Sequence, residues 1–178
     1  MEAGSRAADE VRVTLLRRLG LAALAILVLA APAESRAPSA QANSTERQVI
    51  AAINAVRADY GLKPLRFASP LFRAARKHSR DMGENDYFSH STLTSGESFD
   101  QRVLRFQDRR QVRWLGETIG WGCGELSTPE EMVQMWMDSP PHRKTLLDPR
   151  FKIVGVGTWV GDFQGYEDVR VFTADFGG

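Results

Sequence analysis

The chain has 178 residues, of which 43% are hydrophobic and 25% charged, a balance that is typical of a globular domain and excludes a fibrous or intrinsically disordered protein. Residues 1–42 hold five of the 23 Lys and Arg residues and four of the 22 Asp and Glu residues, which leaves 18 of each in the remainder. A formally neutral domain lacks the basic field that attracts nucleic acid, so no nucleic-acid partner is expected.

The N-terminal segment has the pattern of a secretory signal peptide. Arg17 and Arg18 precede an uncharged run, 19–33, that is rich in Leu and Ala, and small-residue processing sites follow at APA and AQA. The run is shorter than the roughly 20 apolar residues that span a bilayer. We interpret residues 1–42 as a signal peptide and short linker, and residues 43–178 as a secreted domain. The alternative is an uncleaved anchor, which would be the domain's membrane contact.

Two amphipathic helices are predicted at the start of this domain. The first begins at a capping box, formed either by Asn43 with Glu46 or by Thr45 with Gln48, and ends at Gly61. The second covers about 69–82, with a Ser-Pro start and His78 on its apolar side. That position favours a core histidine over a ligand.

The middle of the domain is predicted to be a polar, turn-rich stretch, 83–98, followed by a short helix over about 99–106. The segment 102–113 contains five arginines. Such charge runs are usually exposed, so we interpret it as a solvated face rather than a contact with an anionic surface.

A further helix is predicted to begin at the sequence Thr-Pro-Glu-Glu, 128–131, which supplies a cap, a first-turn proline and an acidic first turn. Pro140 and Pro141 are predicted to end this helix and to place His142 just beyond it.

The C-terminal part is predicted to form strands. The segments 151–161 and 169–178 are rich in β-branched and aromatic residues and are joined by a turn-prone sequence, which indicates an antiparallel hairpin. The segment 117–124 is a candidate third strand. Helices first and strands last predict an α+β fold class. Cys123 is the only cysteine, so the domain is expected to be disulfide-free.

Three ionisable residues lie in unusual positions. His90 is in an aromatic-rich loop, Glu117 lies inside the apolar sequence WLGETIGWG, and His142 follows two prolines. A buried carboxylate needs a cationic, hydrogen-bonding or metal partner, and the imidazoles are candidates. The spacing carries no ligand signature, so a shared site and three separately satisfied residues both stay open.

The motifs HSRDM, YFSH, GETIGWG, EEMVQMWMDSPPHR, VGVG and TADFGG, in this order, resemble the CAP superfamily of cysteine-rich secretory proteins, antigen 5 and plant pathogenesis-related proteins. The resemblance covers about 46–177 and is to the short bacterial SCP-like extracellular branch. It implies a three-layer α-β-α sandwich with a small antiparallel sheet and an open cleft lined by two histidines and two glutamates.

Carried over by motif, the first histidine is His90, the first glutamate is Glu117 and the second histidine is His142. The second glutamate's position holds Ser139, with Asp138 one residue away, so this chain departs from the full set. The ligand-binding candidates are therefore these five residues. Some family members bind zinc or another divalent ion through the two histidines; a hydrogen-bonded His/Glu network without metal is the other interpretation.

The resemblance, the signal pattern and the lack of a recognisable nucleophile together favour a secreted binding module for a lipid such as a sterol or fatty acid, a glycan or a peptide. One alternative is a divalent-metal-dependent hydrolase in which His90 and His142 hold the ion and Glu117 is the general base. The other is a non-catalytic exported scaffold, whose His/Glu set only buttresses the cleft.

Overall fold

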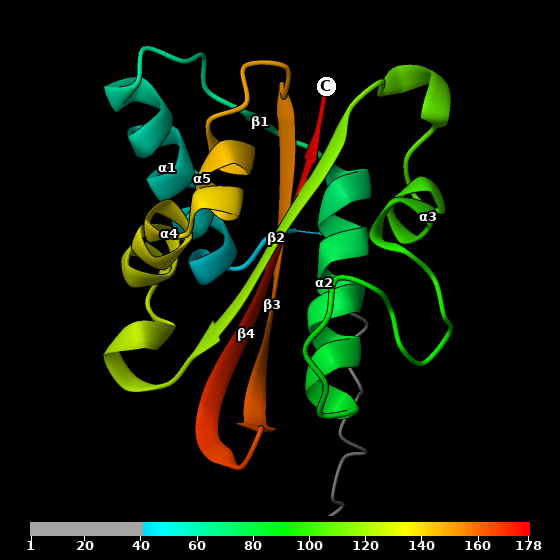
Figure 1. The fold of residues 1–178 in the computed structure, drawn as a ribbon, viewed down its shortest axis with the longest axis vertical. Helices are drawn as coiled ribbons and strands as arrows, with labels where there is room; N and C mark the ends of the chain where they lie inside the picture. The colour runs from blue at the N-terminus through cyan, green and yellow to red at the C-terminus, as the bar shows by residue number, and fades with distance from the viewer. Residues whose placement is uncertain (1–40) are drawn as a thin grey trace, which may run out of the picture. The chain divides into compact units, whose positions relative to one another are not determined.

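The computed structural model describes residues 41–178, in which a four-stranded sheet lies between two layers of helices (Figure 1). The helices are α1 (Ser44–Asp59), α2 (Ser69–Glu84), α3 (Phe99–Leu104), α4 (Pro129–Asp138) and α5 (Pro140–Leu146), and the strands are β1 (Arg66–Phe67), β2 (Leu115–Gly122), β3 (Ile153–Phe163) and β4 (Tyr166–Gly177). The predicted signal segment falls almost entirely outside the described residues. Within residues 41–178, no helix is both long and apolar enough to span a bilayer.

The sheet has the strand order β1-β3-β4-β2. The β3–β4 and β2–β4 pairs are antiparallel, which agrees with the predicted hairpin and third strand. The two-residue strand β1 adds a parallel edge beside β3 that the sequence did not indicate. The other edge strand is β2, which carries Glu117, and the register places Glu117 directly opposite Asp175 of β4.

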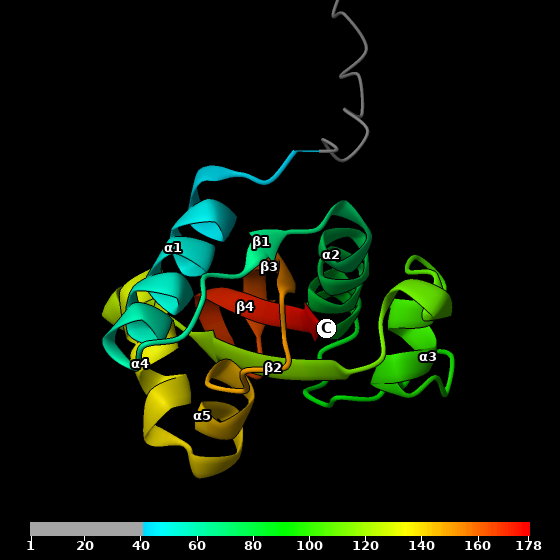
Figure 2. The ribbon, with the colours of Figure 1, turned by 90° about the horizontal axis from the view of Figure 1, so that it is seen from above.

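Figure 2 shows the two helical layers: α2 and α3 lie on one side of the sheet, and α1, α4 and α5 lie on the other. The larger hydrophobic core lies on the α1/α4 side and includes Trp136 and Phe172, both almost completely buried. The indole N–H of Trp136 donates to the carbonyl of Ile119, which ties α4 to β2. This three-layer arrangement confirms the expected fold class.

On the opposite side of the sheet, helix α2 packs closely on β3 at two glycines, which have no side chain. A Cβ built on Gly155 would lie 2.0 Å from the backbone nitrogen of Phe72, and one on Gly157 would lie 2.2 Å from that of Arg76. Helix α2 therefore lies directly on the backbone of β3. This contact explains the VGVG sequence, because any larger residue at either glycine would push the helix away.

The two prolines have a second role that the sequence interpretation missed. Helix α4 ends at Asp138 as predicted, but Pro140 and Pro141 form the first turn of a separate helix, α5. The first turn of a helix needs no backbone N–H donor, so proline is accepted there. His142 consequently lies inside the first turn of α5 instead of in a loop.

Helix α5 is anchored from the opposite end by Arg57 of α1. The guanidinium is 1% exposed, and its Nη1 donates to the carbonyls of Leu146, at 2.6 Å, and Asp148, at 3.1 Å. These carbonyls lie at the C-terminus of α5, where backbone acceptors lack partners within the helix. The contact fixes the helix that carries His142.

Candidate ligand-binding site

His90 lies in the loop between α2 and α3, and its side chain is 52% exposed. Its Nδ1 is 2.8 Å from Oε1 of Glu117. A carboxylate only accepts hydrogen bonds, so Nδ1 carries the proton and donates it. In the neutral ring this leaves Nε2 as an acceptor, and the orientation of the ring is determined by a buried residue.

Glu117 itself is held by a cation. Its side chain is 1% exposed, and its second oxygen, Oε2, accepts a hydrogen bond from Nη2 of Arg102, whose side chain is completely buried. The cationic partner of the Glu117 carboxylate is therefore Arg102, whereas the sequence interpretation had named the imidazoles as candidates. The interpretation of 102–113 as a solvated face is wrong for Arg102, because pairing with a buried carboxylate compensates its burial, whereas Arg109 and Arg110 are exposed.

Arg102 also holds the backbone of the loop. Its Nη1 donates to the carbonyl of His90, at 3.1 Å, and to the hydroxyl of Thr92, at 3.0 Å. One guanidinium thus fixes both the main chain of His90 and the carboxylate that orients its ring. The sequence signal was helical spacing: Arg102 lies three residues after Phe99 and four before Phe106, and both phenylalanines are partly buried.

His78 supports the same loop from α2. It is completely buried, and its Nε2 lies 2.8 Å from the carbonyl of Ser89, to which it donates. Burial lowers the pKa of His78 to about 4, so the ring is neutral near neutral pH. The expectation of a core histidine is confirmed.

His142 approaches His90 from α5. The two ring centroids are 6.4 Å apart, with 51° between the ring planes. Burial, followed by the proximity of His90, lowers the pKa of His142 from its ordinary value. Both α3 and α5 contact β2. The structure thus brings His90, Glu117 and His142 together over this edge strand.

Asp138 and Ser139 do not join this cluster. Asp138 is exposed and accepts a hydrogen bond from the amide of Gln134, at 2.9 Å. Ser139 is the N-cap residue of α5, but its hydroxyl caps no backbone N–H there. None of the hydrogen bonds or ion pairs recorded for residues 41–178 links either side chain to His90, Glu117 or His142.

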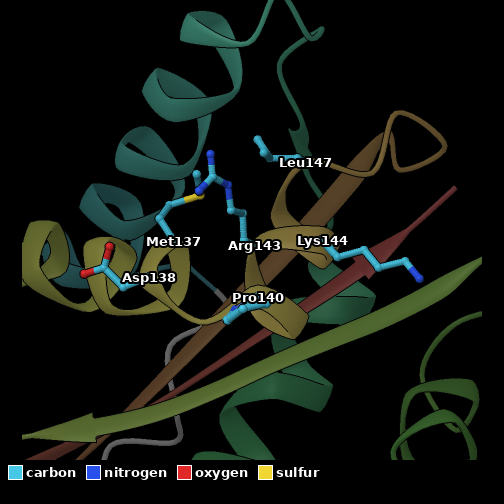
Figure 3. A pocket seen from close by; sticks show the side chains of 6 residues that line it. All are labelled: Met137, Asp138, Pro140, Arg143, Lys144 and Leu147. Atoms are coloured by element: carbon cyan, nitrogen blue, oxygen red, sulfur yellow. The ribbon is translucent and has the colours of Figure 1, made fainter.

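Asp138 instead lines a separate pocket of about 330 Å³ beside the α4–α5 junction (Figure 3). The lining residues are Met137, Asp138, Pro140, Arg143, Lys144 and Leu147. The α5 members of this set follow the i, i+3, i+4 spacing of one helix face, and His142 falls on the opposite face. This pocket and the paired imidazoles are therefore two distinct places on α5.

A second buried acid, Asp175, was not among the predicted site residues. It lies on β4 opposite Glu117 and is completely buried. Burial first, and then the charge of Glu117, raise the pKa of Asp175 well above its usual range. The sequence contained the same signal that drew attention to Glu117, namely an acid within an apolar strand, TADFGG.

The donor set does not fit a metal site. Both Glu117 oxygens accept hydrogen bonds, and the adjacent Arg102 guanidinium would repel a cation. Two imidazoles remain, whereas catalytic zinc sites use three protein ligands. Across residues 41–178, no group of three or more His, Cys, Asp or Glu side chains is arranged to hold an ion.

We therefore expect zinc to have no structural effect on this protein. Purified protein should contain no stoichiometric zinc, and adding zinc or a chelator should leave its melting temperature unchanged, because an ion that binds the folded state would raise it. Elemental analysis and thermal denaturation measure the two quantities. A zinc-dependent rise in melting temperature that His142→Ala abolishes would show that two imidazoles are enough.

Comparison with known proteins identifies bacterial relatives. A model of the cysteine-rich secretory protein family matches residues 50–176. The uncharacterized protein YkwD of Bacillus subtilis (strain 168) is 39% identical over 135 residues, which are 72% of this chain and 50% of YkwD. The uncharacterized membrane protein YlbC of the same organism is 33% identical over 114 residues, 64% of this chain and 31% of YlbC. The chain spans half or less of these relatives.

Solved structures show the same fold. An extracellular protein containing an SCP domain from Bacillus anthracis str. Ames matches with a TM-score of 0.60 and 29% identity, over 74% of this chain and 39% of that one. An outer surface protein from Borrelia burgdorferi matches with a TM-score of 0.60 and 19% identity, over 76% and 95% of the two chains, and is evidence for the fold alone. Because the family model covers most of the sequence, the chain belongs to the cysteine-rich secretory protein, or CAP, family.

Proposed function

We propose that residues 43–178 form an exported CAP domain that binds a ligand at the paired imidazoles of His90 and His142. One observation carries this proposal: a 52% exposed imidazole is held at Nδ1 by a buried Glu117–Arg102 pair, and a second imidazole lies 6.4 Å from it. A side chain that served only packing would not need an oriented ring at the surface. The arrangement leaves Nε2 of His90 for a partner outside the protein.

The surroundings of His90 favour a ligand with an apolar part. Phe88 and Leu93, in the same loop, are 44% and 60% exposed. Ligand sites combine apolar side chains with a few polar groups that fix orientation. A sterol or fatty acid offers a polar group for the imidazoles and an apolar body for these residues, so we place lipids before glycans and peptides.

Two findings support export. The N-terminal segment has the signal-peptide pattern, with cleavage expected after Ala42. The structural relative from Bacillus anthracis, which is 29% identical, is described as an extracellular protein. We therefore infer that the chain is secreted. Detection of the processed chain outside the cell tests this inference.

Binding titrations test the proposed site. Panels of sterols, fatty acids, glycans and peptides are titrated into the purified protein, and the affinity of any saturable ligand is compared among variants. We expect His90→Ala and His142→Ala each to weaken binding about threefold to tenfold, the range for one lost hydrogen bond. Lys144→Ala, on the other face of α5, is the control and should retain affinity.

Two outcomes contradict the proposal. If no ligand class binds saturably, the imidazoles have no binding role and the scaffold alternative is favoured. If Lys144→Ala weakens binding while both histidine variants retain it, the ligand occupies the α4–α5 pocket instead. The hydrolase alternative is less well supported, because its general base, Glu117, already accepts hydrogen bonds from Arg102 and His90.

A further inference from the structure

Asp175 lies beside the carboxylate that orients His90, and the proposed function does not use it. Directly opposed residues of antiparallel strands project to the same face, with Cβ atoms about 4.5–5.5 Å apart. Glu117 and Asp175 are such a pair, and their exposed fractions are 7% and 0%. Two buried carboxyl groups therefore lie side by side with one guanidinium, that of Arg102.

Asp175 receives no hydrogen bond from the described groups around it. Neither of its carboxyl oxygens has a hydrogen-bond partner within the described part of the chain. The Nη atoms of Arg102 donate to Glu117 and to the loop that carries His90, and its buried Nε–H has no hydrogen-bond partner in residues 41–178, so it does not donate to Asp175 either. The Nε2–H of the neutral His78 donates to Ser89, so that ring has no second proton to give. An ionised Asp175 would thus be a buried charge that no hydrogen bond compensates, next to the like charge of Glu117.

We propose that Asp175 is a protonated carboxylic acid in the native protein and donates its O–H to Glu117. Each oxygen of Glu117 has two acceptor positions, so it can take this bond as well as those from His90 and Arg102. The charges of Arg102 and Glu117 then cancel, and Asp175 adds none. Asp175 is a positioning residue: it holds Glu117, which in turn orients His90.

The charged and titratable groups facing Asp175 agree with this assignment. They are Glu117 on β2 and Arg102 on α3. His78 on α2 interacts with these same two groups, and its ring is neutral. Burial and the charge of Glu117 raise the pKa of Asp175, and Arg102 opposes them only in part. The inference concerns the architecture of the site and holds whatever ligand binds there, so it stands or falls separately from the proposed function.

Asp175→Asn tests the inference, because its amide can donate to Glu117 as the acid O–H does. A group whose pKa is raised on folding contributes stability that is complete below its unfolded value, about 4 for Asp, and is lost as pH rises towards the folded value. Asparagine has no such loss. We therefore expect the melting temperature of Asp175→Asn, relative to the parent, to increase steadily from about pH 4 upwards.

Asp168→Asn is the matched control, because Asp168 is an exposed residue of the same strand and its φ of 51° also suits asparagine. It should show no such pH-dependent gain. If Asp175 were instead an ionised partner of Arg102, Asp175→Asn would have a lower melting temperature than the parent near pH 7. That result would overturn the inference.

Two spectroscopic measurements complete the test. The parent protein should show the infrared carbonyl band of a protonated carboxylic acid near pH 7, and Asp175→Asn should lack it; absence of the band in the parent would also overturn the inference. Nitrogen NMR reports the tautomer of His90. We expect the Nδ1–H form to be retained in Asp175→Asn and reduced in Asp175→Ala. Equal retention in both variants would contradict the positioning role.

Discussion

Arg102→Ala is expected to destabilise the domain by about 3–5 kcal/mol, the range for removing one partner of a buried ion pair. Both side chains of the pair with Glu117 are at most 1% exposed, so solvent does not screen the loss. The variant also loses the two hydrogen bonds to the His90 loop. Because domains are stable by only about 5–15 kcal/mol, the loss is a large part of the total. Urea denaturation measures it.

Arg105→Ala is the control for this prediction. Arg105 follows the same helix, is 60% exposed and pairs with Glu97 at the surface. Exposed pairs contribute little, so its loss should be far smaller. Arg102→Lys should not restore stability, because an ammonium cannot serve the carboxylate and the loop with the geometry of a planar guanidinium. Equal losses in Arg102→Ala and Arg105→Ala would refute the importance of the buried pair.

Gly157→Val is expected to destabilise the domain by about 3 kcal/mol or more, at the upper end of the range for overpacked cores. The added Cβ would lie 2.2 Å from the backbone nitrogen of Arg76, and a helix backbone cannot rotate aside as a flexible side chain can. The whole of α2 would have to move away from β3. Thermal and urea denaturation measure the effect, and a soluble variant of unchanged stability would contradict it.

Gly61→Asn is the control for this glycine. Gly61 follows α1 with a φ of 69°, and no atom lies within 4 Å of a Cβ built there. Gly61 is needed for its left-handed backbone conformation and not for close packing. Asparagine tolerates that conformation better than other residues with side chains. A small loss at Gly61 beside a large one at Gly157 separates close packing from backbone conformation.

Sequence patterns predicted the elements that depend on local signals. The Asn43–Glu46 capping box at the start of α1 is present in the structure, and Thr128 caps α4 as expected. Caps and first-turn prolines act over three or four residues, so they can be recognised in the chain directly. The β3–β4 hairpin is also local, because its strands are joined by a short turn.

The parts that escaped prediction depend on residues far apart in the sequence. Arg102 was judged by the arginines that follow it, whereas its burial depends on Glu117, 15 residues away. Asp175 meets Glu117 only because β4 pairs with β2. Strand β1 has two residues and is defined by its pairing with β3, so no local pattern marks it. The convergence of His90 and His142 was expected from family resemblance, since their spacing carries no ligand signature.

The order of the strands has a consequence for how this domain is made. Strand β4 is hydrogen-bonded on both sides, to β3 and to β2, and it extends to Gly177. While the nascent chain is still being synthesised, β2 has no neighbour to pair with, and the acid that faces Glu117 does not yet exist. A ribosome must therefore reach the last strand before any of the antiparallel sheet can assemble.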